Sequence, residues 1–312
     1  MIPAGRGGAA GRGGAMAGVA ALALGLLIGV PRASGAAGVA VLRSSDLAVY
    51  RQTAAAFRRA HTGPVLELAL DQVGAEDAIR RLRSADPEAV VAVGLRAAAL
   101  IRDRLPRTPL VYCMVPSPAR HQLVGSRITG ISADIPPALE LGLLRAIAPD
   151  VRSVGVLVGR ESEAWVREAR AAGERLGIEV RVARVASIEQ LGPLVRGLVE
   201  STDALWMPAD AQVATPEAFQ FAMAEALLYR RPMLVFAPGL VRGGALAAAA
   251  PDLDWVGTKT AEAVRRIQSG ERASDIPSLV MRQVRLVANL ATARALGLEI
   301  PPGALSDAEL VR

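Results

Sequence analysis

Short hydrophobic runs alternate with amphipathic segments along most of the chain. Eight runs rich in Val, Leu, Ala and Met predict strands, at residues 39–42, 65–70, 90–93, 110–115, 154–158, 178–185, 204–207 and 233–236. Few polar positions interrupt these runs, which is typical of strands that helices bury on both faces. We therefore predict an α/β fold in which parallel sheets are flanked by helices.

The segments between the runs have the spacing of helices. Leu47, Tyr50, Ala54 and Phe57 recur on one helical face, and arginines occupy the other positions. We interpret the aromatic pair as core packing. Helix-end signals agree with this pattern: the candidate N-caps are Asp46, Ser162 and Thr215, with Pro216 in a first turn and Gly177 at a helix end.

The alternation of strands and helices occurs twice, which predicts two similar lobes. The first set covers residues 39–115, and the second begins at Val154 after a segment, residues 128–134, that we interpret as a hinge strand. We assign residues 37–134 and 244–280 to the first lobe, and residues 135–243 and 281–312 to the second, with hinges near 129–134 and 238–244.

Residues 1–36 have the features of a secretory signal peptide. Arg6 and Arg12 precede an apolar run at residues 15–30, which is followed by small residues at 33–37. The run is shorter than the roughly 18 to 20 residues that span a bilayer, so we expect cleavage and export to the periplasm. With no cysteine near the cut to carry a lipid, we expect the mature protein to be free in solution.

Composition narrows the classes of function. Lys259 is the only lysine beside 35 arginines, and the charges are scattered without a basic run, so we do not expect nucleic-acid binding. Removal of residues 1–36 would lower the formal net charge from +6 to +3. Cys113 is the only cysteine and lies in an apolar run, where we expect a buried thiol.

Motifs for catalysis, metals and dinucleotides do not occur in the sequence. The chain has two histidines, His61 and His121, without a His-x-x-x-His pair, a Cys/His cluster or a Gly-x-Ser-x-Gly motif. The turns after residues 93 and 158 have no glycine triplet for a pyrophosphate. We therefore expect no metal, no cofactor and no enzymatic activity.

An ordered set of short motifs resembles one family. The motifs are VVAVG at 90–94, PLVY at 109–112, ITGIS at 128–132, VGVL at 154–157, DALWMPAD at 203–210, GGAL at 243–246 and VANLATARALGLEIP at 287–301. In the last motif Asn289 would cap a helix that Gly297 ends. The chain resembles the ABC-transporter substrate-binding proteins with the type I periplasmic-binding fold, a group that includes aromatic amino-acid binders.

The resemblance implies a ligand site at the carboxyl ends of the parallel strands. Its implied residues are Ser44, Ser45, Asp46, Leu95, Arg96, Pro116 and Ser117 in the first lobe, and Arg160, Glu161, Ser162, Ala209, Asp210, Gln212, Ala237 and Pro238 in the second. Asp210 is the foremost candidate, as a partner for a ligand ammonium, and Arg96 or Arg160 would bind a carboxylate. The capping residues among them have the alternative role of helix caps that contact no ligand.

The resemblance further implies a monomeric periplasmic receptor that closes on a small molecule, an amino acid or a related compound, and delivers it to an ABC permease in the inner membrane. The alternative is a sensory or scaffold protein of the same fold that acts on a signalling partner. A third possibility is a cytoplasmic effector domain like that of the sugar regulators, but this would need a DNA-binding segment at residues 1–36, where the export signal stands. The remaining alternative is an enzyme with a Rossmann-like sheet.

Overall fold

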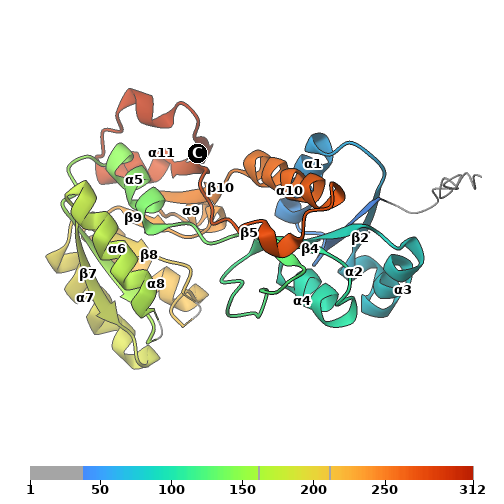
Figure 1. Ribbon diagram of the computed structural model, residues 1–312. Coiled ribbons are helices and arrows are strands. Elements are labelled where there is room, and N and C mark those ends of the chain that lie inside the picture. Colours follow the sequence, from blue (N-terminus) through green and yellow to red (C-terminus); the bar gives the residue numbers. More distant parts are fainter. Residues whose placement is uncertain (1–37, 161, 211, 312) are drawn as a thin grey trace, which may run out of the picture. The chain divides into compact units, whose positions relative to one another are not determined.

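The computed structural model describes residues 38–160, 162–210 and 212–311. The predicted signal peptide and Glu161 lie outside these residues. The described chain contains two sheets, each covered by helices on both faces (Figure 1). We call each sheet with its helices a lobe, lobe 1 being the one that contains the first strand.

Lobe 1 is built on a five-stranded parallel sheet in the order β2-β1-β3-β4-β5. Its strands are β1 (Val39–Arg43), β2 (Val65–Ala69), β3 (Ala89–Val93), β4 (Leu110–Val115) and β5 (Ile128–Ser132). The first four were predicted from the hydrophobic runs, and β5 is the predicted hinge strand. Because the sheet is parallel, the loops that follow its strands all lie at one edge.

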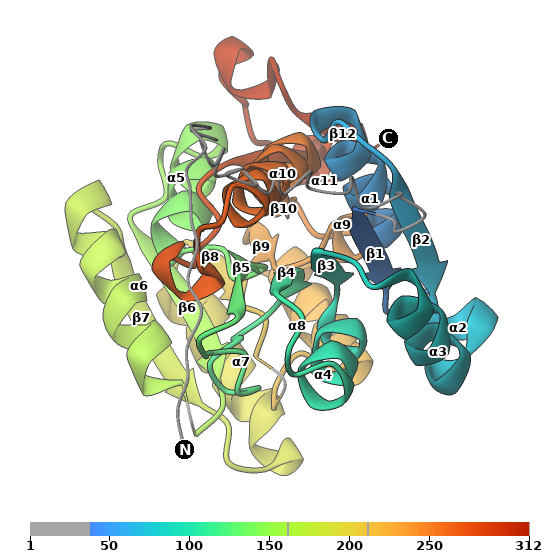
Figure 2. The same cartoon turned by 45° about the vertical axis from the view of Figure 1, so that its right-hand side comes forward.

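Two helix layers cover this sheet. One face packs against α1 (Ala48–Ala60) and α10 (Leu253–Gln268), and the other against α2 (Leu70–Val73), α3 (Ala75–Ala85) and α4 (Leu95–Arg104). Both views show α1 beside α10 (Figures 1 and 2). A Cβ added at Gly257 would lie 2.6 Å from the Cβ of Ala56, so glycine permits this close crossing.

Lobe 2 is built on a seven-stranded sheet in the order β12-β11-β10-β9-β8-β6-β7. All neighbouring strands are parallel except β10 and β11. The strands are β6 (Ser153–Val158), β7 (Glu179–Arg184), β8 (Ala204–Met207), β9 (Met233–Val235), β10 (Ala247–Pro251), β11 (Val284–Asn289) and β12 (Glu309–Val311). The sequence predicted β6 to β9 and missed the last three strands.

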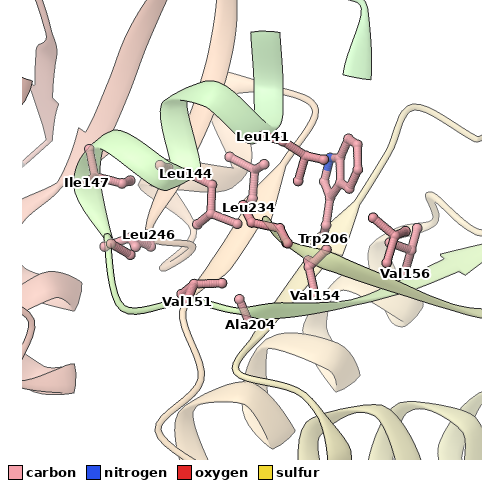
Figure 3. Packing of buried hydrophobic residues seen from close by; sticks show 14 of the residues in the cluster. Leu141, Leu144, Ile147, Val151, Val154, Val156, Ala204, Trp206, Leu234 and Leu246 are labelled. Carbon is pink, nitrogen blue, oxygen red and sulfur yellow. The ribbon is translucent and has the colours of Figure 1, made fainter. Parts of the chain in front are cut away.

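Helices also cover both faces of the second sheet. One face holds α5 (Pro137–Ile147), α6 (Glu163–Leu176) and α11 (Leu290–Leu296), and the other holds α7 (Leu191–Ser201), α8 (Pro216–Leu228) and α9 (Pro238–Arg242). Short 3₁₀ turns occur at Ile188–Gln190, Ala273–Asp275 and Pro302–Leu305. Trp206 of β8 is buried beside Leu141 of α5 (Figure 3).

The chain passes between the two sheets three times, after β5, after β10 and before β11. The predicted boundary at residue 244 is displaced, because β10 pairs with β9 in the second sheet and the crossing follows Pro251. Near the third crossing, Leu279 still forms a bridge to Ile131 of β5. The Gly243-Gly244 motif ends α9 and does not mark a crossing.

Most of the predicted helix ends are confirmed. Thr215 accepts the N–H of Ala218 at 3.2 Å, and Gly177 ends α6 in the left-handed conformation. Asn289 accepts the N–H of Thr292 at 2.9 Å at the start of α11. The prediction for Asp46 was wrong: Leu47 is the N-cap residue of α1, and the side chain of Asp46 binds arginines.

Cys113 is buried in β4 as predicted, and burial raises the pKa of its thiol to about 12. Within the ranges that the structure describes, no helix combines the length and apolar character needed to cross a membrane.

Candidate functional site

The carboxyl-end loops of lobe 1 carry the predicted residues of the first half of the site. Ser44, directly after β1, is buried, and its Oγ accepts the N–H of Ala97 in α4 at 3.0 Å. This bond fixes the start of α4 to the end of β1. Ser44 therefore has a structural role at the site edge, whereas its neighbour Ser45 is half-buried at the same strand end.

Gly94 brings an unpredicted aromatic residue into this region. Its φ of 88° lies in the left-handed region that favours glycine, and an added Cβ would lie 2.7 Å from Ser44 Oγ and 2.9 Å from the hydroxyl of Tyr50. The phenol of Tyr50 thus ends against the backbone that follows β3. Its ring is half-buried against the lobe 1 core, and burial raises the pKa of the hydroxyl.

Tyr50 is a candidate site residue that helical periodicity alone assigns to the core. The ring does pack on core residues, as predicted, but its hydroxyl reaches the strand ends and makes no hydrogen bond within the described residues. The sequence feature that could have identified Tyr50 as a site residue is its position in the first helical turn after a strand. In a parallel α/β fold, such first turns lie at the carboxyl edge of the sheet.

Asp46 lies in an ion-pair network of lobe 1. Arg43 Nη1 and Arg51 Nη1 donate to its two carboxylate oxygens at 2.5 and 2.9 Å, and its own backbone N–H donates to Asp71 at 2.7 Å. The hydrogen bond from Arg43 is the main cause that lowers the pKa of Asp46. Both of its oxygens are therefore occupied by the chain itself.

The loops after β3 and β4 place the other lobe 1 candidates. Leu95 and Arg96 are the first two residues of α4; Leu95 packs on the core, while Arg96 is exposed and has no ion pair in the described chain. After β4, Pro116 is exposed, and the N–H of Ser117 donates to Asp134 at 2.8 Å. The Ser132 hydroxyl donates to the same carboxylate at 2.6 Å, which joins the β4 and β5 loops.

In lobe 2, Asp210 joins the loops that follow β6 and β8. Its Oδ2 accepts the N–H of Gly159 at 2.8 Å and the hydroxyl of Ser162, and its Oδ1 accepts the N–H of Gln212 at 2.9 Å. Ser162 occupies the N-cap position of α6, as predicted, but its side chain makes no capping bond there. Asp210 thus orders the start of α6 from a neighbouring loop.

Gln212 extends this link. Its Oε1 accepts the backbone N–H of Arg160 at 2.7 Å, and a Cβ at Gly159 would overlap the same amide, only 2.0 Å away. The loop after β8 therefore wraps closely around the turn after β6. We call the bonds that Asp210 and Gln212 make to residues 159–162 the β6–β8 clasp.

The remaining lobe 2 candidates differ in chemistry. The side chain of Arg160 is exposed and forms no ion pair within the part of the chain that the structure describes. Ala209 is exposed, and Ala237 and Pro238 begin α9 with no polar side chain. Arg160 is therefore the free charge that the described strand-end loops of lobe 2 offer to a ligand.

The structure brings the predicted residues together in two groups, one at each carboxyl edge. Two hollows lie elsewhere in lobe 1: one of about 450 Å³ beside Arg51, Arg58 and Glu67, and one of about 210 Å³ at the amino ends of β4 and β5. Neither is lined by a predicted site residue. Among the described residues, no three His, Cys, Asp or Glu side chains are placed to hold a metal ion.

Lobe 2 also buries an ionisable group next to Trp206 of β8. Glu140 in the first turns of α5 is only 5 % exposed, and burial raises its pKa to about 8. The indole N–H of Trp206 partly offsets this rise, yet it makes no well-aligned hydrogen bond in the described chain. The indole is thus an electrostatic neighbour of Glu140, and Figure 3 shows its nitrogen on the side of Leu141.

Comparisons with known structures identify the fold. The chain is similar to a substrate binding protein with adhesive properties from Clostridium difficile, in its ligand-free, open form, with 20% identity and a TM-score of 0.73 over 88% of this chain and 98% of that one. It is also similar to an ABC domain from Streptococcus pneumonia in complex with L-Trp, with 22% identity and a TM-score of 0.59 over 88% and 100% of the two chains.

A third similar structure is a conserved domain protein from Vibrio cholerae, with 21% identity and a TM-score of 0.59 over 88% of this chain and 99% of that one. The fold is that of the type I periplasmic binding proteins. A search of curated protein sequences found no significant match. The family model described as ABC transporter substrate binding protein matches residues 70–311. The chain therefore belongs to the ABC transporter substrate binding protein family.

Proposed function

We propose that the protein is a periplasmic receptor that closes on a small solute and delivers it to an ABC permease in the inner membrane. One observation carries this proposal: each lobe has a carboxyl edge of parallel strands, and three chain crossings join the two lobes. A pivot at the crossings would bring the two edges onto one ligand, as in hinge closure.

We further infer that the protein acts by binding and not by catalysis. Three serine hydroxyls near the strand ends bond to carboxylates or to backbone: Ser162 to Asp210, Ser132 to Asp134, and Ser44 to Ala97. Within the described chain no histidine hydrogen-bonds to a serine or to Cys113, so the described residues hold no Ser–His or Cys–His pair of the kind that activates a nucleophile.

Ligand-driven closure gives the direct test. Purified mature protein would be screened by thermal shift against amino acids, organic acids, nucleosides and small peptides, and each hit examined by small-angle scattering. A ligand that binds only the folded protein adds about 2.7 kcal/mol at a hundredfold excess over Kd, and closure lowers the radius of gyration. Binding without compaction would reject the closing receptor.

Export and delivery need separate measurements. Mass spectrometry of periplasmic protein should show an N-terminus between Gly35 and Val39, and recovery of the full-length chain from the cytosol alone would contradict export. A permease reconstituted with its ATPase should hydrolyse ATP faster when the liganded protein is added. Stimulation of a sensor kinase in place of the ATPase would support the signalling alternative.

A further inference from the structure

We propose that the ligand is a small organic dianion with two carboxylate groups, bound by Arg96 of lobe 1 and Arg160 of lobe 2. This inference rests on the proposed function and names the class of solute. Its basis is which charged side chains at the two carboxyl edges have partners within the described chain. The acids there are occupied, and two arginines are not.

The strand-end aspartates are occupied by the chain. Asp46 accepts from Arg43 and Arg51, one at each oxygen. Asp134 accepts from Ser117 and Ser132, and Asp210 holds the β6–β8 clasp through both of its oxygens. A ligand ammonium would have to displace one of these donors to reach a carboxylate.

The other described acids beside these loops belong to helix starts. Asp71, Glu163 and Glu217 stand in the first turns of α2, α6 and α8, where the positive end of each helix favours a negative charge. Glu163 is also paired with Arg184. These acids are therefore balanced within their own elements and give no built site for an ammonium group.

The arginines show the opposite situation. Arg96 follows β3 and Arg160 follows β6; both are exposed, and neither forms an ion pair among residues 38–160, 162–210 and 212–311. A guanidinium binds a carboxylate through two parallel hydrogen bonds, and one such group on each lobe suits a ligand with an acid at each end. Among the described residues of the two edges, a zwitterion would meet two positive charges and no acid that the chain leaves unoccupied.

Tyr50 adds a neutral donor to the lobe 1 half of this site. Its hydroxyl lies against Gly94, two residues before Arg96, and has no hydrogen-bond partner in the described chain. A phenol O–H at this position is placed to donate to the carboxylate that Arg96 binds. The phenol is neutral, so Tyr50 adds a hydrogen-bond donor and no third positive charge to the two arginines.

Calorimetry on the full mature protein tests the proposal with defined probes. Succinate, glutarate and adipate represent dicarboxylates, butyrate a monocarboxylate, and alanine and tryptophan zwitterions. We expect at least one dicarboxylate to bind, and Arg96→Gln and Arg160→Gln each to weaken it by roughly ten- to hundredfold, because each removes a charged hydrogen-bonding group. Tyr50→Phe should weaken it less.

Matched variants separate binding from folding. Arg107→Gln, in the exposed loop before β4, and Arg170→Gln, on α6, remove the same charge away from the carboxyl edges and should leave affinity unchanged. Melting curves of the ligand-free variants would show that Arg96→Gln and Arg160→Gln fold normally.

Three results would overturn the proposal: no dicarboxylate binds, an amino acid binds more tightly than every dicarboxylate, or the two arginine variants keep full affinity. The proposed function would survive any of these results if another solute binds and compacts the protein. It would fail separately if dicarboxylates bind without compaction.

Discussion

Two aspartates that follow strands, Asp46 in lobe 1 and Asp210 in lobe 2, have both carboxylate oxygens occupied but by different partners. Asp46 binds the side chains of Arg43 and Arg51 and remains 36% exposed. Asp210 binds backbone N–H groups and a hydroxyl from two loops. The first is an ion pair that water and salt weaken, whereas the second fixes the path of the backbone.

The lobes also differ in the ionisable groups that they bury. Lobe 2 buries Glu140, with a pKa raised to about 8, and lobe 1 buries Cys113, with a pKa raised to about 12. The first changes its charge within the physiological range and the second does not. The stability of lobe 2 should therefore depend on pH within this range.

The largest predicted effect is the pH dependence due to Glu140. An unfolded glutamate ionises near its ordinary pKa of 4.5, but the folded one keeps its proton until about pH 8. The folded state thus binds more protons between these values, and the free energy of unfolding falls as pH rises through this window, by on the order of a few kcal/mol. Below pH 4.5 the stabilisation is fully present.

Glu140→Gln should remove this slope, because an amide stays neutral. Urea unfolding of both proteins between pH 4.5 and 9 would measure the effect, and the advantage of the variant should grow up to about pH 8. Glu174→Gln on the exposed side of α6 is the control and should leave the slope unchanged. Parallel profiles for Glu140→Gln and the unmodified protein would contradict the prediction.

The next effect is the loss of the β6–β8 clasp. Asp210→Ala leaves the N–H of Gly159 and the hydroxyl of Ser162 without their acceptor, and we expect the ligand-free protein to lose about 2 to 3 kcal/mol of unfolding free energy. Asp210→Asn keeps one acceptor oxygen and should lose less. An unchanged urea midpoint in both variants would show that the clasp contributes nothing to stability.

The smallest effect is expected for Asp46→Asn. Its carboxylate is 36% exposed and its Arg51 partner 52% exposed, so the melting temperature should fall less than for Asp210→Asn, and the difference should shrink in about 1 M salt. Melting curves at low and high salt measure both points. A loss as large as that of Asp210→Asn, or one that persists in high salt, would remove the distinction between the two edges.

The sequence predicted the parts of the fold that hydrophobic patterning controls. The Val-rich runs of β1, β3 and β6 are buried as expected, whereas β10, with the sequence AAAAP, was missed because alanine carries little strand preference. Its pairing with β9 and β11 depends on residues distant in sequence. The boundary between the lobes was displaced for the same reason.

For the candidate site, the sequence could predict positions but not bonding partners. Parallel strands place Ser44, Arg96, Arg160 and Asp210 at carboxyl edges by topology alone. Whether a polar atom there is free depends on loops from other strands, as for Ser44 with Ala97 and Asp210 with Gly159. Tyr50 was assigned to the core because periodicity describes the ring and not its hydroxyl.

The close crossing of α1 and α10 has a consequence for synthesis of the chain. Ala56 packs against Gly257, so the apolar face of α1 lacks its cover until the ribosome has made most of the protein. Between α1 and α10 in the sequence come the other strands of lobe 1 and then β6 to β10 of lobe 2. Lobe 1 therefore cannot be obtained by cutting the chain after β5. A nascent chain of that length would expose the apolar face of α1 to chaperones.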